Sequence, residues 1–510
     1  MILLNLERNS EQPIFKQIYQ QLKQLMENNT LRPGFRMPST RALAERHGVN
    51  RSTVYKVYEE LGAMGYLESR PGSYSIVRKR QRIATNGQKS KTGLIAWEKL
   101  SSDAGQMLHQ SYQKFKYKIS DVSPDVINLA SLELDPRLFP VQDFRRCINT
   151  VMVEKGAALL GYGERAGFKP LRKTIADRLR FHGISVNWEE ILITNGSQNG
   201  IELLMKLLTV PGTLAAVEAP TYSNALPLLK YYKTNIIEIP MKEDGMDLGY
   251  LQQVLETGSS KPAFVYTMPN FHNPTGITTD QVHREKLLSL CEAYRVPILE
   301  DGFEEEMKYF GKVPLPIKSM DRQHLVIYLG TFSKVLFPGI RIGWIAAEKD
   351  IIQRLMAIKA FSDLTSNSLL QAALHEFCQQ GYYNLHVKRM HREYRKRMTT
   401  AITGFREHLT GFDKVSWTEP AGGYLIWLKL RDTNMDEAGL RQLFLQHGIT
   451  VIPGTCFYSD AYSYPGSPSP ASNPSLHHFR ISISTLNEKE IKEGISRLGR
   501  AVARIYKKAA

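Results

Sequence analysis

A lysine, two hydroxyl residues and an arginine lie close together between Gly330 and Arg341. The amine of Lys334 can condense with an aldehyde to form an imine. The hydroxyl groups of Thr331 and Ser333 can reach a phosphate, and Arg341, seven residues after the lysine, can hold a phosphate as a bidentate partner. Together these groups predict a ligand that has both an aldehyde and a phosphate, as pyridoxal 5′-phosphate does. The alternative is a surface lysine beside an ion-paired arginine.

A second phosphate-binding element is predicted after the apolar run at residues 191–193. The turn that follows contains Gly196, Ser197 and Gln198 and precedes an amphipathic stretch, so its backbone amides would open a helix and can bind a phosphate. Tyr222 follows another strand-like run and can stack on a cofactor ring. Taken singly, the turn can be a simple helix cap and the tyrosine a core residue.

Asn273 and Asp301 supply the remaining polar contacts that a pyridine ring needs. Asn273, within residues 271–276, can donate to the phenolic oxygen of the ring. Asp301 ends an apolar run and would keep the pyridine nitrogen protonated, so that the ring withdraws electrons. A strand-end aspartate is also a common helix cap. The five groups together, in this order, predict one cofactor site.

The elements that must position these residues alternate along the chain from about residue 125. Short runs rich in β-branched and aromatic residues, such as 264–266 and 326–328, alternate with helical stretches. This alternation predicts an α/β domain with a largely parallel sheet. Ligands bind in the loops that follow such strands, which is where the five groups lie.

Length and composition indicate a soluble, multidomain protein. The chain has 510 residues, of which 42% are hydrophobic and 23% charged, and it contains neither a membrane-length apolar run nor a secretion signal. We therefore expect it in the cytoplasm. Its four cysteines are widely separated, which predicts no disulfide framework and no metal site. The net charge of +16 suggests a polyanionic partner, and residues 1 to 80 hold 13 Lys and Arg against 7 Glu.

The basic front of the chain has the pattern of a winged helix-turn-helix. Apolar residues recur every four positions from Ile14 to Met26 and predict a first helix. A capping residue at 39 or 40 can open a second helix, and Asn50 lies at the start of a third. Two strand-like segments flank a Pro-Gly turn at 71–72 and predict a hairpin. This order predicts a DNA-binding domain over residues 1–78.

The residues expected to contact DNA are polar or basic and lie on the second helix, at the start of the third helix and in the hairpin. They are Arg41, Asn50, Arg51, Ser52, Thr53, Lys56 and Arg70. The third helix would enter the major groove, while Arg41 and Arg70 would meet phosphates. A small helical protein-interaction domain with a solvated basic face is the alternative.

Residues 79–124 are predicted to be a linker. Polar and basic residues dominate its first half, which favours a flexible segment. The later part has enough apolar residues to dock on a neighbour or to form a short helix.

Two family resemblances support these predictions. The segment 31–44, LRPGFRMPSTRALA, resembles the N-terminal domain of GntR-type bacterial repressors. Residues from about 125 to 510 resemble the aspartate aminotransferase superfamily of fold type I pyridoxal phosphate enzymes, with a large domain at about 125–385 and a small domain at about 386–510.

The second resemblance implies a role for each residue of the predicted site. Lys334 would be the Schiff-base lysine and Asp301 the partner of the pyridinium, while Asn273 would contact the phenolic oxygen and Tyr222 would stack on the ring. Arg480, within 478–482, matches the arginine that binds the α-carboxylate of an amino acid. The residues expected to hold the phosphate are Gly196, Ser197, Gln198, Ser333 and Arg341.

Both halves together resemble the MocR subfamily of bacterial regulators. This resemblance implies a homodimer in which the head of one subunit lies over the body of the other, binding double-stranded operator DNA and sensing pyridoxal phosphate or an amine or amino acid. A tyrosine common in the enzymes is replaced here by Phe303 and Glu304, which is expected to slow transamination. Two alternatives remain open: a competent amino acid aminotransferase with an accessory head, and a sensor of pyridoxal phosphate alone.

Overall fold

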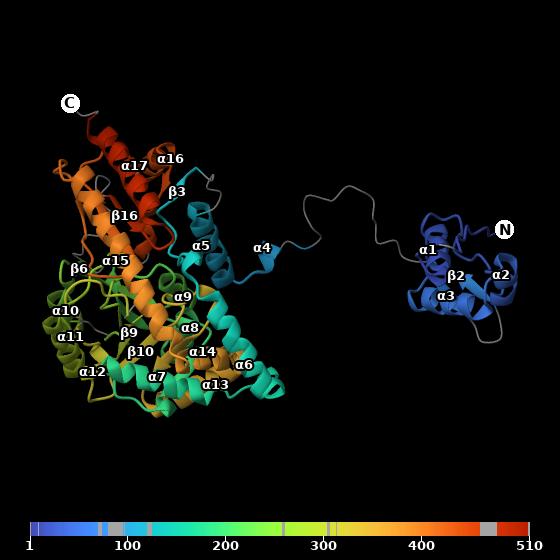
Figure 1. Cartoon of the computed structure of the whole chain (residues 1–510), viewed down its shortest axis with the longest axis horizontal. Coiled ribbons are helices and arrows are strands. Elements are labelled where there is room, and N and C mark those ends of the chain that lie inside the picture. Colours follow the sequence, from blue (N-terminus) through green and yellow to red (C-terminus); the bar gives the residue numbers. More distant parts are fainter. Residues whose placement is uncertain are drawn as a thin grey trace. The chain divides into compact units, whose positions relative to one another are not determined.

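The chain forms two compact units, Met1–Lys99 and Leu100–Ala510, called the head and the body below (Figure 1). The computed structural model describes residues 2–8, 10–69, 74–79, 95, 97–119, 125–257, 261–302, 306–312, 314–459 and 477–507. The predictions made for Arg70, for the turn at 71–72, and for Phe303 and Glu304 fall outside these ranges.

The head is a winged helix-turn-helix, as predicted. Its elements are α1 (Ile14–Glu27), α2 (Thr40–His47), α3 (Arg51–Ala63), β1 (Leu67–Ser69) and β2 (Ser75–Val77). The side chain of Ser39 accepts from the amide of Ala42 and caps α2, while Gly48 ends α2 with a φ of 61°. Asn50 caps α3 in the same way, and β1 pairs antiparallel with β2. The short turn at 48–50 therefore fixes α3 against α2.

The body is built on an eight-stranded sheet in the order β4-β11-β10-β9-β8-β5-β6-β7. The strands are β4 (Ile191–Thr194), β5 (Leu214–Ala219), β6 (Asn235–Lys242), β7 (Gly245–Met246), β8 (Val265–Thr267), β9 (Ile298–Asp301), β10 (Val326–Thr331) and β11 (Gly343–Ala346). The five strands from β10 to β6 run parallel, whereas β11 is antiparallel to both of its neighbours. The prediction of a largely parallel sheet is confirmed.

Helices cover both faces of this sheet, which gives the α/β body of a fold type I aminotransferase. One face packs against α8 (Ser197–Leu208), α9 (Ala225–Tyr231) and α13 (Lys349–Ser362). The other face packs against α6 (Val141–Leu160), α7 (Lys169–Phe181), α14 (Ser368–Gln379), α10 (Leu248–Thr257), α11 (Gln281–Tyr294) and α12 (Ile317–Met320). The strands are buried on both sides, and this explains their continuous apolar runs.

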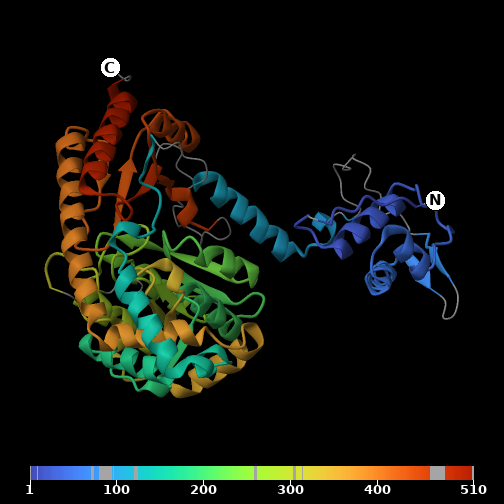
Figure 2. The ribbon, with the colours of Figure 1, turned by 45° about the vertical axis from the view of Figure 1, so that its right-hand side comes forward.

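The C-terminal part of the body has a smaller sheet in the order β12-β13-β16-β15. Its strands are β12 (Val415–Trp417), β13 (Leu425–Leu430), β15 (Ile452–Pro453) and β16 (His477–Ser482), and its helices are α15 (Tyr382–Leu409), α16 (Glu437–Gln446) and α17 (Glu488–Lys507). Figures 1 and 2 show α15 and α17 side by side, and the two helices are in contact. The start of the body returns to this part, because β3 (Ile127–Asn128) pairs with β14 (Ile449–Thr450).

Within the predicted linker the structure describes α4 (Trp97–Leu100) and α5 (Asp103–Ile119). Helix α5 contacts α9 and so belongs to the body. Short 3-10 helices lie at Pro136–Leu138, Trp188–Glu190, Pro338–Ile340 and Gly454–Phe457. Among the residues described, no helix has both the length and the apolar character needed to cross a membrane.

Candidate cofactor site

The sheet brings all five predicted segments to one edge. Tyr222, Asn273, Asp301 and Lys334 follow or end the parallel strands β5, β8, β9 and β10, so they lie at the carboxyl ends of neighbouring strands. Strand β11 runs against both β10 and β4, which makes β4 run in the same direction as β10. The turn after β4, with Gly196, therefore opens at the same edge.

Asp301 is a buried carboxylate with one oxygen fixed and one available. The Tyr266 hydroxyl donates to Oδ2 at 2.8 Å, whereas Oδ1 has no hydrogen-bond partner among the residues described. Burial raises the pKa of Asp301 to about 6; the Tyr266 hydrogen bond opposes this shift and the nearby charge of Glu218 adds to it. Tyr266 was not predicted as a site residue, because its place in the apolar run of β8 is typical of an ordinary strand residue.

Lys334 and Ser333 lie in the turn that follows β10. The half-buried Lys334 Nζ donates to the carbonyl of Leu132 at 2.9 Å, and its own carbonyl accepts from the Tyr424 hydroxyl at 2.7 Å. The buried Ser333 Oγ has no hydrogen-bond partner in the described part of the chain. Thr331 Oγ1 accepts from the Ser333 amide at 3.1 Å and donates to a backbone carbonyl at 3.3 Å, so it shapes the turn.

The phosphate-binding turn is formed by Gly196 at the start of α8 and by Arg341. Gly196 has a φ of 85°, a conformation that favours glycine, and a β-carbon there would lie 2.6 Å from Arg341 Nη2, so any other residue would displace the guanidinium. Arg341 Nη2 donates to the carbonyl of Asn195 at 2.9 Å. Ser197 and Gln198 begin α8, so their amides lie at the helix N-terminus. This arrangement can hold a phosphate between the helix start and the guanidinium.

Tyr222, Asn273 and Arg480 come together from three segments. Arg480, which is 5% exposed, donates through Nη1 to Asn273 Oδ1 at 3.1 Å and through Nη2 to the carbonyl of Ala130 at 2.9 Å. Burial raises the pKa of Tyr222, and the charges of Asp301 and Arg480 also act on this phenol, so the ring lies near both groups. The segment of Ala130 and Leu132 was not predicted as part of the site; it contributes backbone carbonyls, which leave no signal in side-chain patterns.

These residues fit pyridoxal phosphate. Asp301 Oδ1 and Ser333 Oγ have no partner among the described residues. The Asp301 oxygen matches a protonated ring nitrogen, Ser333 Oγ and the start of α8 match a phosphate, and Lys334 provides the amine. When bound, the cofactor supplies an aldehyde and an electron-withdrawing ring. Within the described ranges, no group of three or more His, Cys, Asp or Glu side chains is placed to hold a metal ion.

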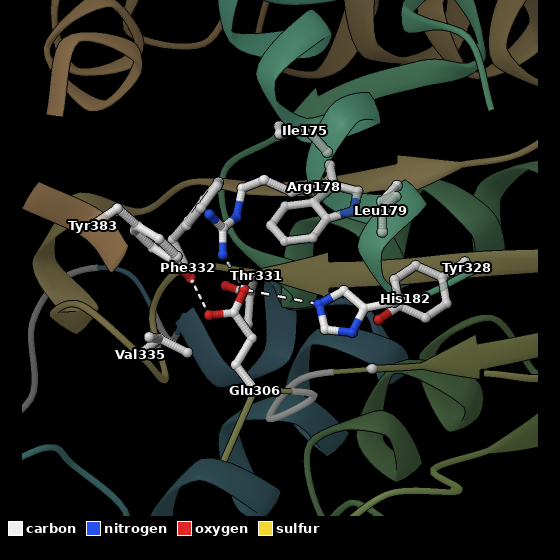
Figure 3. Close-up of a pocket in the computed structure, with 12 residues that line it drawn as sticks. Ile175, Arg178, Leu179, His182, Glu306, Tyr328, Thr331, Phe332, Val335 and Tyr383 are labelled. Carbon is white, nitrogen blue, oxygen red and sulfur yellow. Dashed lines mark hydrogen bonds and ion pairs between the residues drawn. The ribbon is translucent and has the colours of Figure 1, made fainter. Parts of the chain in front are cut away.

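A separate pocket is lined by Arg178, Glu306 and Tyr383, among other residues (Figure 3). Arg178 from α7 makes an ion pair with Glu306 and lies over the ring of Tyr383, with 3.9 Å from the guanidinium carbon to the ring centroid. The Tyr383 hydroxyl donates to the same carboxylate at 3.1 Å. Although burial alone would raise it, the pKa of Glu306 is lowered by His182 and Arg178. This cluster anchors Glu306 to α7 and α15.

Replacing Glu306 by glutamine is expected to destabilise the body by about 3 kcal/mol at pH 7, because it leaves the largely buried Arg178 guanidinium without its carboxylate. The parent should lose this contribution as the pH falls below the ordinary carboxyl range, since the pKa of Glu306 is lowered only in the folded state. Denaturant unfolding of both proteins at several pH values measures the difference. Arg406→Gln, which breaks an exposed pair with Glu419, should change stability little.

The predicted DNA-contact residues of the head are mostly exposed. Arg51 and Lys56 point to solvent from α3, whereas Thr53 is half-buried. Asn50 Oδ1 accepts from the Ser52 amide at 3.0 Å and from the Ser52 hydroxyl at 2.9 Å, so both side chains take part in the cap of α3. On α2, the exposed Arg41 pairs with Glu45 at 2.9 Å.

The head has a groove between α3 and the β1-β2 wing. Its lining includes Arg36, Arg51, Tyr55 and Tyr74, and the Arg36 guanidinium stacks on the Tyr74 ring at 3.7 Å. Tyr55 was missed by the sequence analysis, although it is an aromatic between two predicted contact residues and is 54% exposed. A surface with these cations and open aromatics can follow a phosphate backbone.

Known families match both units of the chain. Residues 124–498 match "Aminotransferase class I and II", and residues 14–77 match "Bacterial regulatory proteins, gntR family".

Curated relatives include enzymes and regulators. The chain is 33% identical to aromatic-amino-acid aminotransferase 1 of Thermococcus litoralis, over 82% of this chain and 98% of that protein. It is 29% identical to the uncharacterized HTH-type transcriptional regulator YisV of Bacillus subtilis, over 98% of each chain. It is also 29% identical to the probable rhizopine catabolism regulatory protein MocR of Rhizobium meliloti, over 80% of each chain.

Solved structures resemble the body. The multiple substrate aminotransferase of Thermococcus profundus has a TM-score of 0.74 at 30% identity and covers 81% of this chain and 100% of its own. The α-aminoadipate aminotransferase LysN of Thermus thermophilus, complexed with N-(5'-phosphopyridoxyl)-L-leucine, has a TM-score of 0.71 at 27% identity, over 81% of this chain and 99% of its own.

Proposed function

Because the chain belongs to the aminotransferase class I and II family and carries a gntR-family head, as MocR-type regulators do, we propose that its body senses a small ligand and that its head passes the signal to operator DNA. The cofactor is pyridoxal phosphate. The observation that carries the proposal is one chain that combines a site fitted to this cofactor with a DNA-binding head.

An amine or amino acid is the ligand that the site favours. Arg480 is buried beside Asn273 and Tyr222, and a guanidinium in this position can bind a carboxylate through paired hydrogen bonds. Lys334 places its amine at the same edge of the sheet. The second candidate is pyridoxal phosphate itself, for which Arg480 is not needed.

The segment from Ala130 to Leu132 provides a physical route from the site to the rest of the body. It accepts hydrogen bonds from both Arg480 and Lys334. It follows β3, which pairs with β14 in the C-terminal part. A ligand that binds Arg480 or Lys334 breaks the hydrogen bond from that side chain to this segment. The free energy of the C-terminal part would therefore depend on whether the ligand is bound. Couplings of this kind are typically about 1–3 kcal/mol.

We also propose a homodimer with exchanged heads. Phe361 and Leu364 are 96% and 57% exposed, and Asp363, directly before Leu364, accepts from Asn195 Nδ2 at 2.5 Å, next to the phosphate-binding turn. Large apolar side chains so exposed favour burial by a second copy. Two heads would bind a repeated operator. A DNA-binding regulator must reach the chromosome, so we place the protein in the cytoplasm.

DNA selection from random duplexes tests the proposal. The full-length protein with its cofactor should enrich a repeated half-site, and its affinity for that duplex should change by about 5- to 150-fold when the effective amino acid, found by screening, is added. Arg51→Ala should weaken binding by about 1–3 kcal/mol. If the selection enriches no sequence, or if no amino acid or cofactor changes the affinity, the proposal is wrong.

The enzyme alternative rests on the Thermococcus litoralis relative, which is an aminotransferase by name. Sustained turnover of an amino donor and a 2-oxo acid, together with DNA binding that ignores both, would support it.

A further inference from the structure

Helix α15 holds most of the net positive charge of residues 125–510. Residues 125–510 contain 46 Lys and Arg against 40 Asp and Glu, an excess of six. Seven of these cations and only two glutamates lie in α15, so this one helix accounts for an excess of five. The rest of the body is nearly balanced, and the charge of α15 is therefore a local feature.

Five of the cations form one exposed surface, here called the basic face: Lys388, Arg389, Arg392, Arg395 and Lys396. At 3.6 residues per turn they fall within an arc of about 120°. The opposite side of the helix, including Met390, Tyr394 and Met398, is fully buried in the core of the body. The basic face thus points to solvent along the outer side of the helix.

The other two cations of α15 have structural partners. Arg397 is buried and pairs with Asp135 at 2.6 Å, and Arg406 pairs with Glu419. No side chain of the basic face makes an ion pair with any residue that the structure describes, although the Arg395 guanidinium lies over the Phe310 ring at 5.4 Å from its centroid. Like charges three and four residues apart destabilise a helix by a few tenths of a kcal/mol each. A polyanion would remove this repulsion.

A groove beside the basic face adds further cations. They are Arg178 and Lys308, and the lining also includes Asn384 and a single carboxylate, Glu306, which Arg178 already engages. Lys308 therefore adds one cation beside the basic face that this carboxylate does not engage.

We propose that the basic face is a second DNA-binding surface, which contacts the phosphate backbone without reading sequence. From Lys388 to Lys396 the helix rises about 12 Å, and duplex DNA carries a phosphate charge for about every 1.7 Å of its axis, so each cation has a phosphate within reach. An anionic membrane fits less well, because a helix that lies in a membrane surface needs an apolar face, and that face of α15 is buried in the body. The inference rests on the proposed function, since it presupposes a chain that binds DNA through its head.

The test compares two triple variants of the full-length protein on a random-sequence duplex of about 60 base pairs. Lys388→Gln, Arg392→Gln and Lys396→Gln remove three charges from the basic face. Lys233→Gln, Lys286→Gln and Arg295→Gln remove three exposed charges elsewhere on the body and serve as the control. The measured quantity is the slope of the logarithm of the binding constant against the logarithm of salt concentration. Each lost phosphate contact should make the slope shallower by about 0.9. The slope of the first variant should therefore be shallower than that of the parent by about 2–3, and the slope of the control should be unchanged.

Equal slopes in the first variant and the parent would overturn the inference. Binding of the parent, but not of this variant, to phosphatidylserine vesicles with an unchanged DNA slope would also overturn it and would indicate a membrane partner. Melting curves and cofactor absorbance should match the parent, which excludes misfolding. Arg51→Ala separates this inference from the proposed function. If the parent binds no duplex, the proposed function fails. If Arg51→Ala weakens DNA binding while the basic-face variant binds like the parent, the proposed function stands and only the second surface is ruled out.

Discussion

Replacing Lys334 by alanine is expected to abolish covalent retention of pyridoxal phosphate. The Lys334 amine lies at the carboxyl edge of β10, held by the Leu132 carbonyl, and alanine leaves the cofactor without an amine to condense with. After borohydride treatment and denaturation, the parent should keep about one cofactor mass per chain on the peptide that contains Lys334. The variant should keep none.

A matched lysine shows that this loss is specific to the site. Lys349 is exposed and pairs with Glu189 on the surface, so Lys349→Ala should retain the cofactor like the parent. The DNA affinity of Lys334→Ala without ligand should remain close to that of the parent, while its response to amine ligands disappears. If borohydride leaves the same mass of cofactor attached to Lys334→Ala as to the parent, Lys334 is not the residue that forms the imine.

The sequence was informative about the site because parallel strands end at a common edge. Tyr222, Asn273, Asp301 and Lys334 each follow a strand-like run, so a largely parallel sheet has to bring them together. In the head, the four-residue period of α1 and the turn at Gly48 were equally direct signals. These are local patterns whose geometry follows from covalent structure and burial.

The remaining parts depend on contacts between distant segments. The carbonyl of Leu132 lies 202 residues from Lys334, and a backbone acceptor has no sequence signature. Tyr266 could not be distinguished from an ordinary core residue of a strand, since its role is to donate to Asp301 on the neighbouring strand β9. Glu306 pairs with Arg178 of α7 and accepts a hydrogen bond from Tyr383 of α15, two helices far apart in the sequence. Helix α5 lies in the later part of the predicted linker, which was expected to dock on a neighbour or to form a short helix, but nothing local in the sequence pointed to α9 as its partner.

Replacing Asp301 by asparagine is expected to have opposite effects on stability and on cofactor binding. Burial raises the pKa of Asp301 to about 6 in the folded protein, against 3.8 for an ordinary aspartate. The folded state therefore binds the proton more tightly than the unfolded state, and its stability falls as the pH rises from about 4 to about 6 and then stays level. At pH 7 the buried charge costs about 3 kcal/mol, at 1.36 kcal/mol per pKa unit. The cofactor-free variant should be more stable than the parent by up to this amount.

The cofactor should reverse this order. A protonated ring nitrogen beside Asp301 Oδ1 makes a charge-assisted hydrogen bond, worth about 1.5–3 kcal/mol, that asparagine cannot reproduce, so Asp301→Asn should bind pyridoxal phosphate at least about tenfold more weakly. Urea unfolding of the cofactor-free proteins at pH 4 and pH 7, and cofactor titration at pH 7, measure both effects.

Asp321 provides the control, because it is a buried aspartate with the opposite electrostatics. Its pKa is lowered despite burial, since the amide of Val326 and the ammonium of Lys318 donate to its carboxylate at 2.9 and 3.0 Å. Asp321→Asn should therefore destabilise the protein at pH 7 and leave cofactor affinity unchanged. If Asp301→Asn also lowers the stability of the cofactor-free protein at pH 7, then the charge of Asp301 stabilises the fold in the same way as that of Asp321. That result would contradict a role for its Oδ1 in binding the cofactor.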